Sequence, residues 1–147
     1  MAKVVKFWGP AGEYGFLDNF FEREIVINDK VYATTEHYFQ ACKARNEKDH
    51  EFIRLQPNPG KSKYWGNRIN LRPDWEEVKG DVMLEALRAK FTQHSDLQAL
   101  LLLTGDSYII ETSPYDKIWG WGPKRNGQNR LGKSLIQIRE EIKGGLN

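Results

Sequence analysis

Apolar residues recur at helical spacing in several stretches of the chain, whereas strand-like alternation is confined to short runs. The clearest stretch follows Asp74, where apolar residues return every three or four positions from Trp75 to Ala89 and Glu77 completes a capping-box pattern. This spacing places the apolar side chains on one helix face, which has to be buried against other elements. We therefore expect a mainly helical chain.

Weaker signals of the same kind predict further helices over residues 36–45, 47–55, 95–104 and 131–143. Thr34 or Thr35 can cap the first of these through its hydroxyl. The run Pro57-Asn58-Pro59-Gly60 should end the second, and Gly105 suits a left-handed residue after the third.

Strand signals are few. Residues 3–8 and 108–112 each predict a short strand, and residues 23–33 alternate around Asn28-Asp29, which indicates a hairpin. Residues 113–128 are rich in Pro, Gly and Trp without a period, so we expect an irregular loop whose length indicates a function. The elements together predict an α+β, predominantly helical fold: a compact single-domain helical bundle with a small peripheral β-hairpin or sheet.

Size and composition agree with one globular domain over residues 1–147. The formal net charge is +2 and the hydrophobic fraction is 39%, so electrostatics do not demand a nucleic-acid partner and disorder is not expected. No apolar run approaches the roughly 20 residues of a membrane span, and the N-terminus lacks a signal-peptide pattern, so we expect a cytoplasmic protein without a membrane partner. The composition indicates no oligomeric state.

Three polar side chains follow one edge of the first predicted helix. Glu36, Gln40 and Lys43 stand at i, i+4 and i+7, whereas Tyr38 and Phe39 fall largely on the other side. This polar stripe fits a helix face that simply points to water. It also fits a pocket in which a carboxylate, an amide and an amine supply an acid or base, a ribose partner and a nucleophile.

The irregular loop carries a second set of candidates. Glu111 and Asp116 precede Trp119-Gly120-Trp121-Gly122, where glycines would let a flat ligand approach a ring and the backbone closely. Each tryptophan also fits a role as a core anchor. Trp8 and Asn19 flank a glycine-rich turn and could close the same pocket or cover a hydrophobic cluster.

Other residues and motifs give weaker signals. Arg68 follows Gly66-Asn67, where a bend could aim its guanidinium at phosphate, although an isolated Arg is usually solvated. Cys42 is the only cysteine, which excludes an internal disulfide and fits a small buried side chain better than a catalytic thiolate. The three histidines show no metal spacing and no nucleotide-binding glycine motif is present, so we expect no metal and no cofactor.

The chain resembles the NADAR/YbiA-like family in the order and spacing of many short segments from about Phe7 to Arg139. The matching segments are Phe7-Trp8, Asn19-Phe20, residues 35–41 with Lys43, Leu71-Arg72, Asp74-Trp75-Glu76, Val82-Met83, residues 86–91, Thr104-Gly105, Asp116, Trp119-Gly120, Gly122, Gly127 and residues 129–132. The chain departs from the family pattern at Gly66-Asn67-Arg68, where a Gly-Arg pair is common.

The resemblance implies a mainly helical fold and an N-glycosidase. The family's substrates are phosphorylated ribosylamino-pyrimidine intermediates of riboflavin synthesis or ADP-ribose adducts, including ADP-ribosylated guanine in nucleic acid. Carried over position by position, it points to Glu36, Trp75, Asp116 and Trp119, with Lys43 as a further catalytic candidate. The predicted catalytic residues are thus Glu36, Lys43 and Asp116, and the predicted substrate-binding residues are Trp8, Asn19, Gln40, Arg68, Trp75, Trp119 and Asn129.

We expect the polar stripe and the loop to act around one cavity on the C1′–N bond of a small nucleotide-like substrate. In one route a carboxylate activates water while an acid protonates the departing amine. In the other, Lys43 captures C1′ of the opened ribose as a Schiff base, which requires a partly desolvated amine or a neighbouring cation. A non-catalytic module that binds ADP-ribose or a nucleotide is the alternative.

Overall fold

The computed structural model describes residues 3–145, which group into two compact units. Residues 3–18 and 91–145 form the first unit, and residues 19–90 form the second. Six α-helices and two two-stranded sheets occur in the described range, which confirms the predicted α+β, mainly helical class. The expectation of one domain over residues 1–147 stays a prediction, and each unit is described by itself below.

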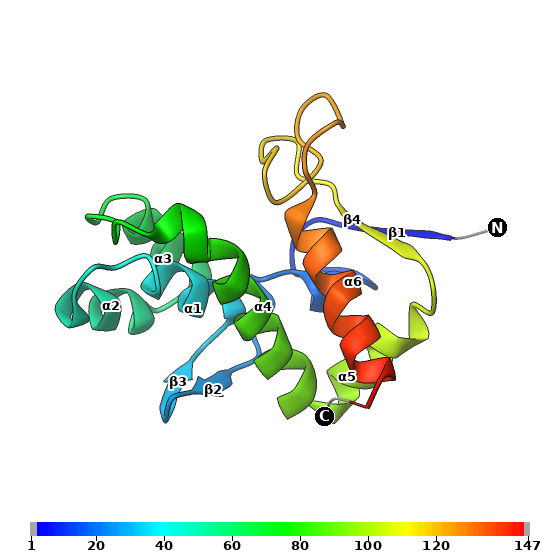
Figure 1. Cartoon of the computed structure of the whole chain (residues 1–147), viewed down its shortest axis with the longest axis horizontal. Helices are drawn as coiled ribbons and strands as arrows, with labels where there is room; N and C mark the ends of the chain where they lie inside the picture. Colours follow the sequence, from blue (N-terminus) through cyan, green and yellow to red (C-terminus); the bar gives the residue numbers. More distant parts are fainter. Residues whose placement is uncertain (1–2, 146–147) are drawn as a thin grey trace. The chain divides into compact units, whose positions relative to one another are not determined.

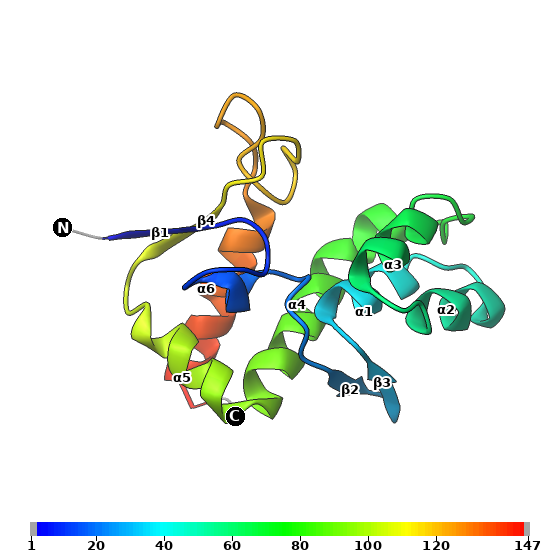
Figure 2. The same ribbon diagram turned by 180° about the vertical axis from the view of Figure 1, so that it is seen from behind.

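A parallel strand pair organises the first unit. Strand β1 (Val4–Phe7) pairs with β4 (Tyr108–Glu111), and Figures 1 and 2 show helix α6 (Arg130–Lys143) running beside β4. A Cβ at Gly132 would lie 2.1 Å from the carbonyl oxygen of Ile109, so only glycine lets α6 approach the strand this closely.

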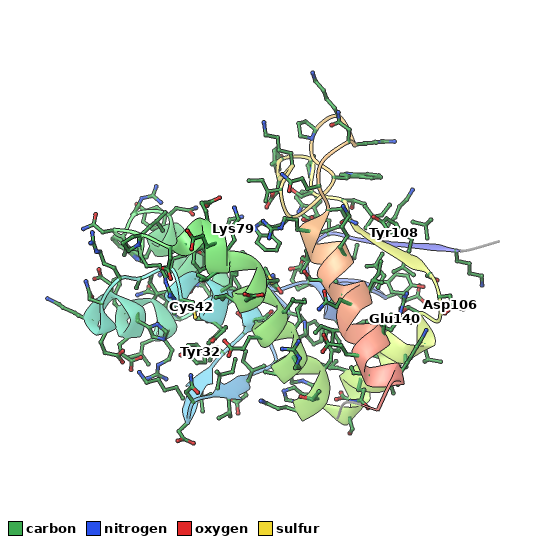
Figure 3. All side chains as sticks on the ribbon, viewed as in Figure 1. Tyr32, Cys42, Lys79, Asp106, Tyr108 and Glu140 are labelled. Carbon is green, nitrogen blue, oxygen red and sulfur yellow. The ribbon has the colours of Figure 1, made fainter. Side chains whose placement is uncertain are left out.

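The rest of this unit's core comes from short helices around the pair. Helix α5 (Ser95–Leu103) and the 3₁₀-helix η1 (Gly15–Leu17) contribute buried leucines and Phe16, and Gly105 has the left-handed φ of 64° predicted for it. Lys143 of α6 forms ion pairs with Asp106 (3.0 Å) and Glu140 (3.3 Å), whose positions Figure 3 marks. The pair with Asp106 joins the end of α6 to the turn after α5, whereas Glu140 lies one turn earlier in α6 itself.

The second unit consists of a hairpin and a group of helices. Strands β2 (Ile25–Ile27) and β3 (Lys30–Tyr32) are antiparallel, and Asn28 and Asp29 between them have φ values of 52° and 64°. Two positive φ values are what a two-residue hairpin turn needs, so the predicted hairpin is confirmed. The helices are α1 (Thr35–Ala41), α2 (Glu47–Arg54), α3 (Pro59–Gly66) and α4 (Trp75–Gln93), whose last three residues belong to the first unit.

Two expectations about this unit were wrong. Helix α1 ends at Ala41 rather than near Arg45, because the Lys43 carbonyl accepts from the Arg72 amide at 2.9 Å and Ala44 forms a β-bridge with Leu71. The sequence pattern does not predict helix α3, because Pro59 and Gly60, its first residues, also belong to the turn pattern that ends α2. Asn58 caps α3 by accepting from the Lys61 amide at 2.8 Å, and Pro59 takes the first helical position.

No helix within residues 3–145 combines the length and the apolar character needed to cross a membrane.

Candidate active site

Hydrogen bonds fix the first turn of α1, which carries Glu36. The Thr34 hydroxyl accepts from the His37 amide (3.1 Å), as predicted for a capping threonine, and bonds the His37 Nδ1 at 2.8 Å. Asn19 Oδ1 accepts from the Thr35 hydroxyl (2.8 Å), and its carbonyl accepts from the Glu36 amide (3.2 Å). Asn19 therefore holds the helix end on which Glu36 stands.

His37 completes this framework as a neutral side chain. Its Nε2 lies 3.0 Å from the Gln56 carbonyl oxygen, which makes Nε2 the protonated nitrogen and leaves Nδ1 to accept from Thr34. Burial lowers the pKa of His37. With both nitrogens in use, the imidazole ties α1 to the end of α2.

Glu36 and Gln40 form a buried pair on α1. Their exposed fractions are 7% and 3%, and Gln40 Nε2 donates to Glu36 Oε2 at 2.6 Å. The alternative in which this stripe points to water is thus wrong for these two residues. The carbonyl end of the same amide, Gln40 Oε1, is buried without a hydrogen-bond partner.

Lys43 lies just beyond the end of α1, in the turn that leads to Ala44. Its Nζ donates to Asn67 Oδ1 at 3.2 Å and lies 5.8 Å from the centre of the Phe39 ring. Burial lowers the pKa of Lys43, Glu36 opposes this shift, and the positive charges of Lys63 and Lys79 add to it. The direction of the shift is the one that a nucleophilic amine requires.

Lys63 and Lys79 come from α3 and α4. Lys79, marked in Figure 3, has a side chain that is 10% exposed and pairs with the exposed Glu76 at 2.7 Å. Sequence analysis missed both lysines, and also Gly66 and Asn67 as neighbours of the polar stripe, because no local pattern links α3 or α4 to α1.

Trp75 packs in the core of the second unit. Its ring is 5% exposed and meets Phe39 edge to face, with 5.1 Å between the ring centres. This is the core role that its helical spacing indicates. A contact between Trp75 and substrate stays a prediction.

Two further candidates, Cys42 and Arg68, are held by contacts within this unit. Burial raises the pKa of the Cys42 thiol to about 11, so Cys42 is a protonated thiol near neutral pH. The Arg68 guanidinium stacks on the Tyr64 ring, 3.5 Å from its centre, and donates to the Tyr64 carbonyl at 2.8 Å. Phosphate binding by Arg68 stays a prediction.

In the first unit, the loop after β4 holds Asp116 and Trp119. Asp116 Oδ1 accepts from the amides of Ile118 (2.9 Å) and Trp119 (2.8 Å), so the carboxylate fixes the turn that presents the tryptophan. The Arg130 guanidinium lies 5.0 Å from the centre of the Trp119 ring. Both Asp116 and Trp119 are half-buried.

Backbone bonds make this predicted loop a defined structure. The amides of residues 128–131 donate to carbonyls of residues 117–120, which folds the loop back on itself. At the base of the loop, the side-chain nitrogen of Asn129 donates to the Ile109 carbonyl (2.8 Å), and its side-chain oxygen accepts from the Glu111 backbone amide (2.9 Å). Asn129 thus holds β4, and its predicted substrate contact is untested.

Trp8 follows β1 and is 56% exposed, with its ring 6.1 Å from that of Tyr115 in an edge arrangement. Trp121, the second tryptophan of the Trp119-Gly120-Trp121-Gly122 segment, donates from its indole nitrogen to the Thr112 carbonyl at 2.9 Å. Trp8 therefore offers ring surface next to the loop, whereas Trp121 is used to anchor it.

The structure thus brings together Glu36, Gln40 and Lys43 in one unit, and Asp116 and Trp119 in the other. The expected meeting of these two sets around one substrate is a relation between units and stays a prediction. Among residues 3–145, no three His, Cys, Asp or Glu side chains gather as metal ligands would.

The chain is similar to known proteins over nearly its whole length. Residues 6–143 match the family model described as the NADAR domain. The chain is 42% identical to N-glycosidase YbiA of Shigella boydii over 95% of this chain and 88% of the relative. It is 33% identical to the maize riboflavin biosynthesis protein PYRR, chloroplastic, over 96% of this chain and 25% of that protein. The NMR structure of Escherichia coli YbiA matches with a TM-score of 0.90 at 40% identity, covering 97% of this chain and 87% of that chain.

Proposed function

Because the chain belongs to the NADAR family, we propose that it hydrolyses the C1′–N bond of a ribose-containing nucleotide derivative. Its similarity to enzymes named N-glycosidase over nearly their whole length makes it an N-glycosidase and sets aside the non-catalytic module. The observation that carries the finer proposal is the group on α1: a buried carboxylate held by an amide, with an amine of lowered pKa beyond it.

The lowered pKa of Lys43 supports the Schiff-base route over direct hydrolysis. In this route the substrate's ribose ring opens, and the neutral Lys43 amine adds to C1′. The C1′–N bond to the base then breaks, and the departing amine takes a proton as the Lys43 imine forms. Water adds to C1′, the imine carbon, and releases the sugar and the free amine of Lys43.

We propose that Glu36 carries protons in these reaction steps. The Glu36 carboxylate, which acts on the Lys43 amine electrostatically, can take the proton that Lys43 loses on adding to C1′, and later activate the water that attacks the imine. Glu36 also raises the pKa of Lys43, so the burial of the amine and the charges of Lys63 and Lys79 have to outweigh it. The net lowered pKa of Lys43 is consistent with that balance.

We propose that the departing base is bound by Trp119, Trp8 and Asp116. An aromatic ring can stack on a base, worth about 1–3 kcal/mol per stack by analogy with base–aromatic contacts. Asp116 fixes the turn of Trp119, so its replacement should disturb that ring as well as remove a charge. The same proposal assigns Trp75, Asn19, Arg68 and Asn129 to substrate binding.

The positive charges around Lys43 support a phosphorylated substrate. Lys63 and Lys79 act on the amine electrostatically, and an anionic substrate would gain from the same charges. Ribosylamino-pyrimidine phosphates of the riboflavin pathway carry such a phosphate, and the resemblance to the maize protein supports them. ADP-ribosyl adducts, including ADP-ribosylated nucleic acid, are the second candidate class.

Release of the free base, measured for both substrate classes, tests this function. The purified protein is incubated with a ribosylamino-pyrimidine phosphate and with ADP-ribosyl-guanine, in parallel with the Glu36→Gln variant. We expect release by the wild type from one class and a loss of at least about 100-fold in the variant. Equal release by the variant would remove Glu36 from the reaction, and no release from either class would refute the proposed substrate.

A further inference from the structure

The end of α3 lies against the side chain that holds Glu36. A Cβ at Gly66 would lie 2.0 Å from Gln40 Oε1, 2.9 Å from Gln40 Cδ and 3.1 Å from Gln40 Cβ. The three nearest atoms to that position all belong to Gln40. The Gln40 amide therefore occupies the space that any other residue at position 66 would fill.

The backbone at position 66 does not itself require glycine. Gly66 is the last residue of α3, and it is absent from the glycines with positive φ. An alanine could adopt its conformation without strain. The glycine is thus explained by the neighbouring amide and not by the local chain geometry.

The Gln40 amide shows an unusual arrangement. Its nitrogen donates to Glu36 Oε2, while its oxygen is buried without a partner beside Gly66. Buried polar atoms without partners are rare, and where they occur they call for an explanation. Turning the amide over would lose the bond to Glu36 and set two acceptor oxygens, Gln40 Oε1 and Glu36 Oε2, against each other. In this orientation Gln40 Oε1 lacks a hydrogen bond, and Gln40 Nε2 donates to the Glu36 carboxylate.

We propose that Gln40 is a positioning residue that holds the Glu36 carboxylate, and that Gly66 is required because it leaves room for the Gln40 amide. The bond from the Gln40 amide fixes the direction in which the Glu36 carboxylate points, which is what a group that has to meet a moving proton needs. The inference rests on the proposed function for the role of Glu36. The geometric part, in which Gly66 fixes Gln40, is independent of any substrate.

Gly66→Ala tests the geometric part, with Gly60→Ala as its matched control. Gly60 lies in the same helix, and a Cβ there meets only Asn58 Oδ1 at an ordinary 3.4 Å. Side-chain amide signals are recorded by ¹⁵N NMR, and Gln40→Ala identifies the Gln40 pair by its disappearance. We expect Gly66→Ala to move the Gln40 signals and Gly60→Ala to leave them in place. Unmoved Gln40 signals in Gly66→Ala would overturn the proposal.

Kinetics test the positioning part. We expect Gln40→Ala and Gly66→Ala each to lower kcat about 10- to 100-fold while KM stays within about threefold, because we propose that the pair acts in the chemical step. A raised KM with an unchanged kcat would instead favour the predicted substrate contact of Gln40. Exposed Gln137 donates to Glu141 in the same i, i+4 relation, so Gln137→Ala controls for loss of such a bond. An unchanged kcat in Gln40→Ala would overturn the positioning role.

A double variant shows whether both residues act through one contact. If Gly66→Ala acts only by displacing the amide, adding it to Gln40→Ala should lower kcat no further. Fully additive losses would show that Gly66 acts by another route and would overturn the proposal. If the wild type releases base from neither substrate class, the proposed function fails, whereas the NMR signals still decide whether Gly66 fixes Gln40.

Discussion

Replacing Asn129 separates its observed structural contacts from its predicted substrate contact. Asn129→Gly keeps access to the residue's left-handed φ of 50° but removes both side-chain bonds to the backbone of β4. Each bond is buried, and leaving its partner unsatisfied costs about 1–3 kcal/mol. The free energy of unfolding should therefore fall by about 2–6 kcal/mol.

For a chain of this size, 1 kcal/mol corresponds to about 2–4 °C in Tm, so we expect a decrease of roughly 5–20 °C by calorimetry. Asn129→Ala should lose about 1–2 kcal/mol more, because alanine resists the left-handed conformation. Asn126→Gly, at an exposed position of the same loop, is the control and should change little. An unchanged Tm in Asn129→Gly together with a raised KM would refute the structural role and favour substrate binding.

Three further predictions concern titrating groups. Lys63→Met removes a charge that lowers the pKa of Lys43, so that pKa should rise and the pH profile of kcat/KM should move to higher pH; an unmoved profile would contradict a neutral Lys43 nucleophile. Burial lowers the pKa of His37 in the folded chain. Between this lowered pKa and the unfolded pKa of about 6.5, only the unfolded chain takes up the proton. The free energy of unfolding should then fall with decreasing pH, by up to about 1.4 kcal/mol per pH unit, until the lowered folded pKa is reached; His37→Gln should flatten this dependence in urea titrations. Because the pKa of Cys42 is raised to about 11, Cys42→Ala should keep kcat within about threefold, and a larger loss would indicate a catalytic thiol.

Much of the fold could be predicted from local patterns. The hairpin at Asn28-Asp29, the Thr34 cap and the left-handed Gly105 each depend on a few neighbouring residues, and all three are confirmed. Helix α3 was missed because Pro57-Asn58-Pro59-Gly60 both ends one helix and begins the next. The early end of α1 depends on contacts with Leu71 and Arg72, which no local pattern reveals.

The candidate site was predictable only in part for the same reason. Helical spacing places Glu36 beside Gln40, and the resemblance adds their chemistry. The positions of Gly66, Asn67, Lys63 and Lys79 relative to α1 depend on how α3 and α4 pack, which is a non-local property. The parallel pairing of β1 with β4 likewise joins distant parts of the chain.

Borohydride trapping during turnover tests the central claim that Lys43 is the nucleophile. Hydride reduces an imine between the Lys43 amine and C1′ to a stable amine, and peptide mass spectrometry locates the added sugar. We predict an adduct on the peptide that contains Lys43, with loss of activity in proportion to labelling and no adduct in Lys43→Met. Continued base release with no adduct at Lys43 would contradict the account.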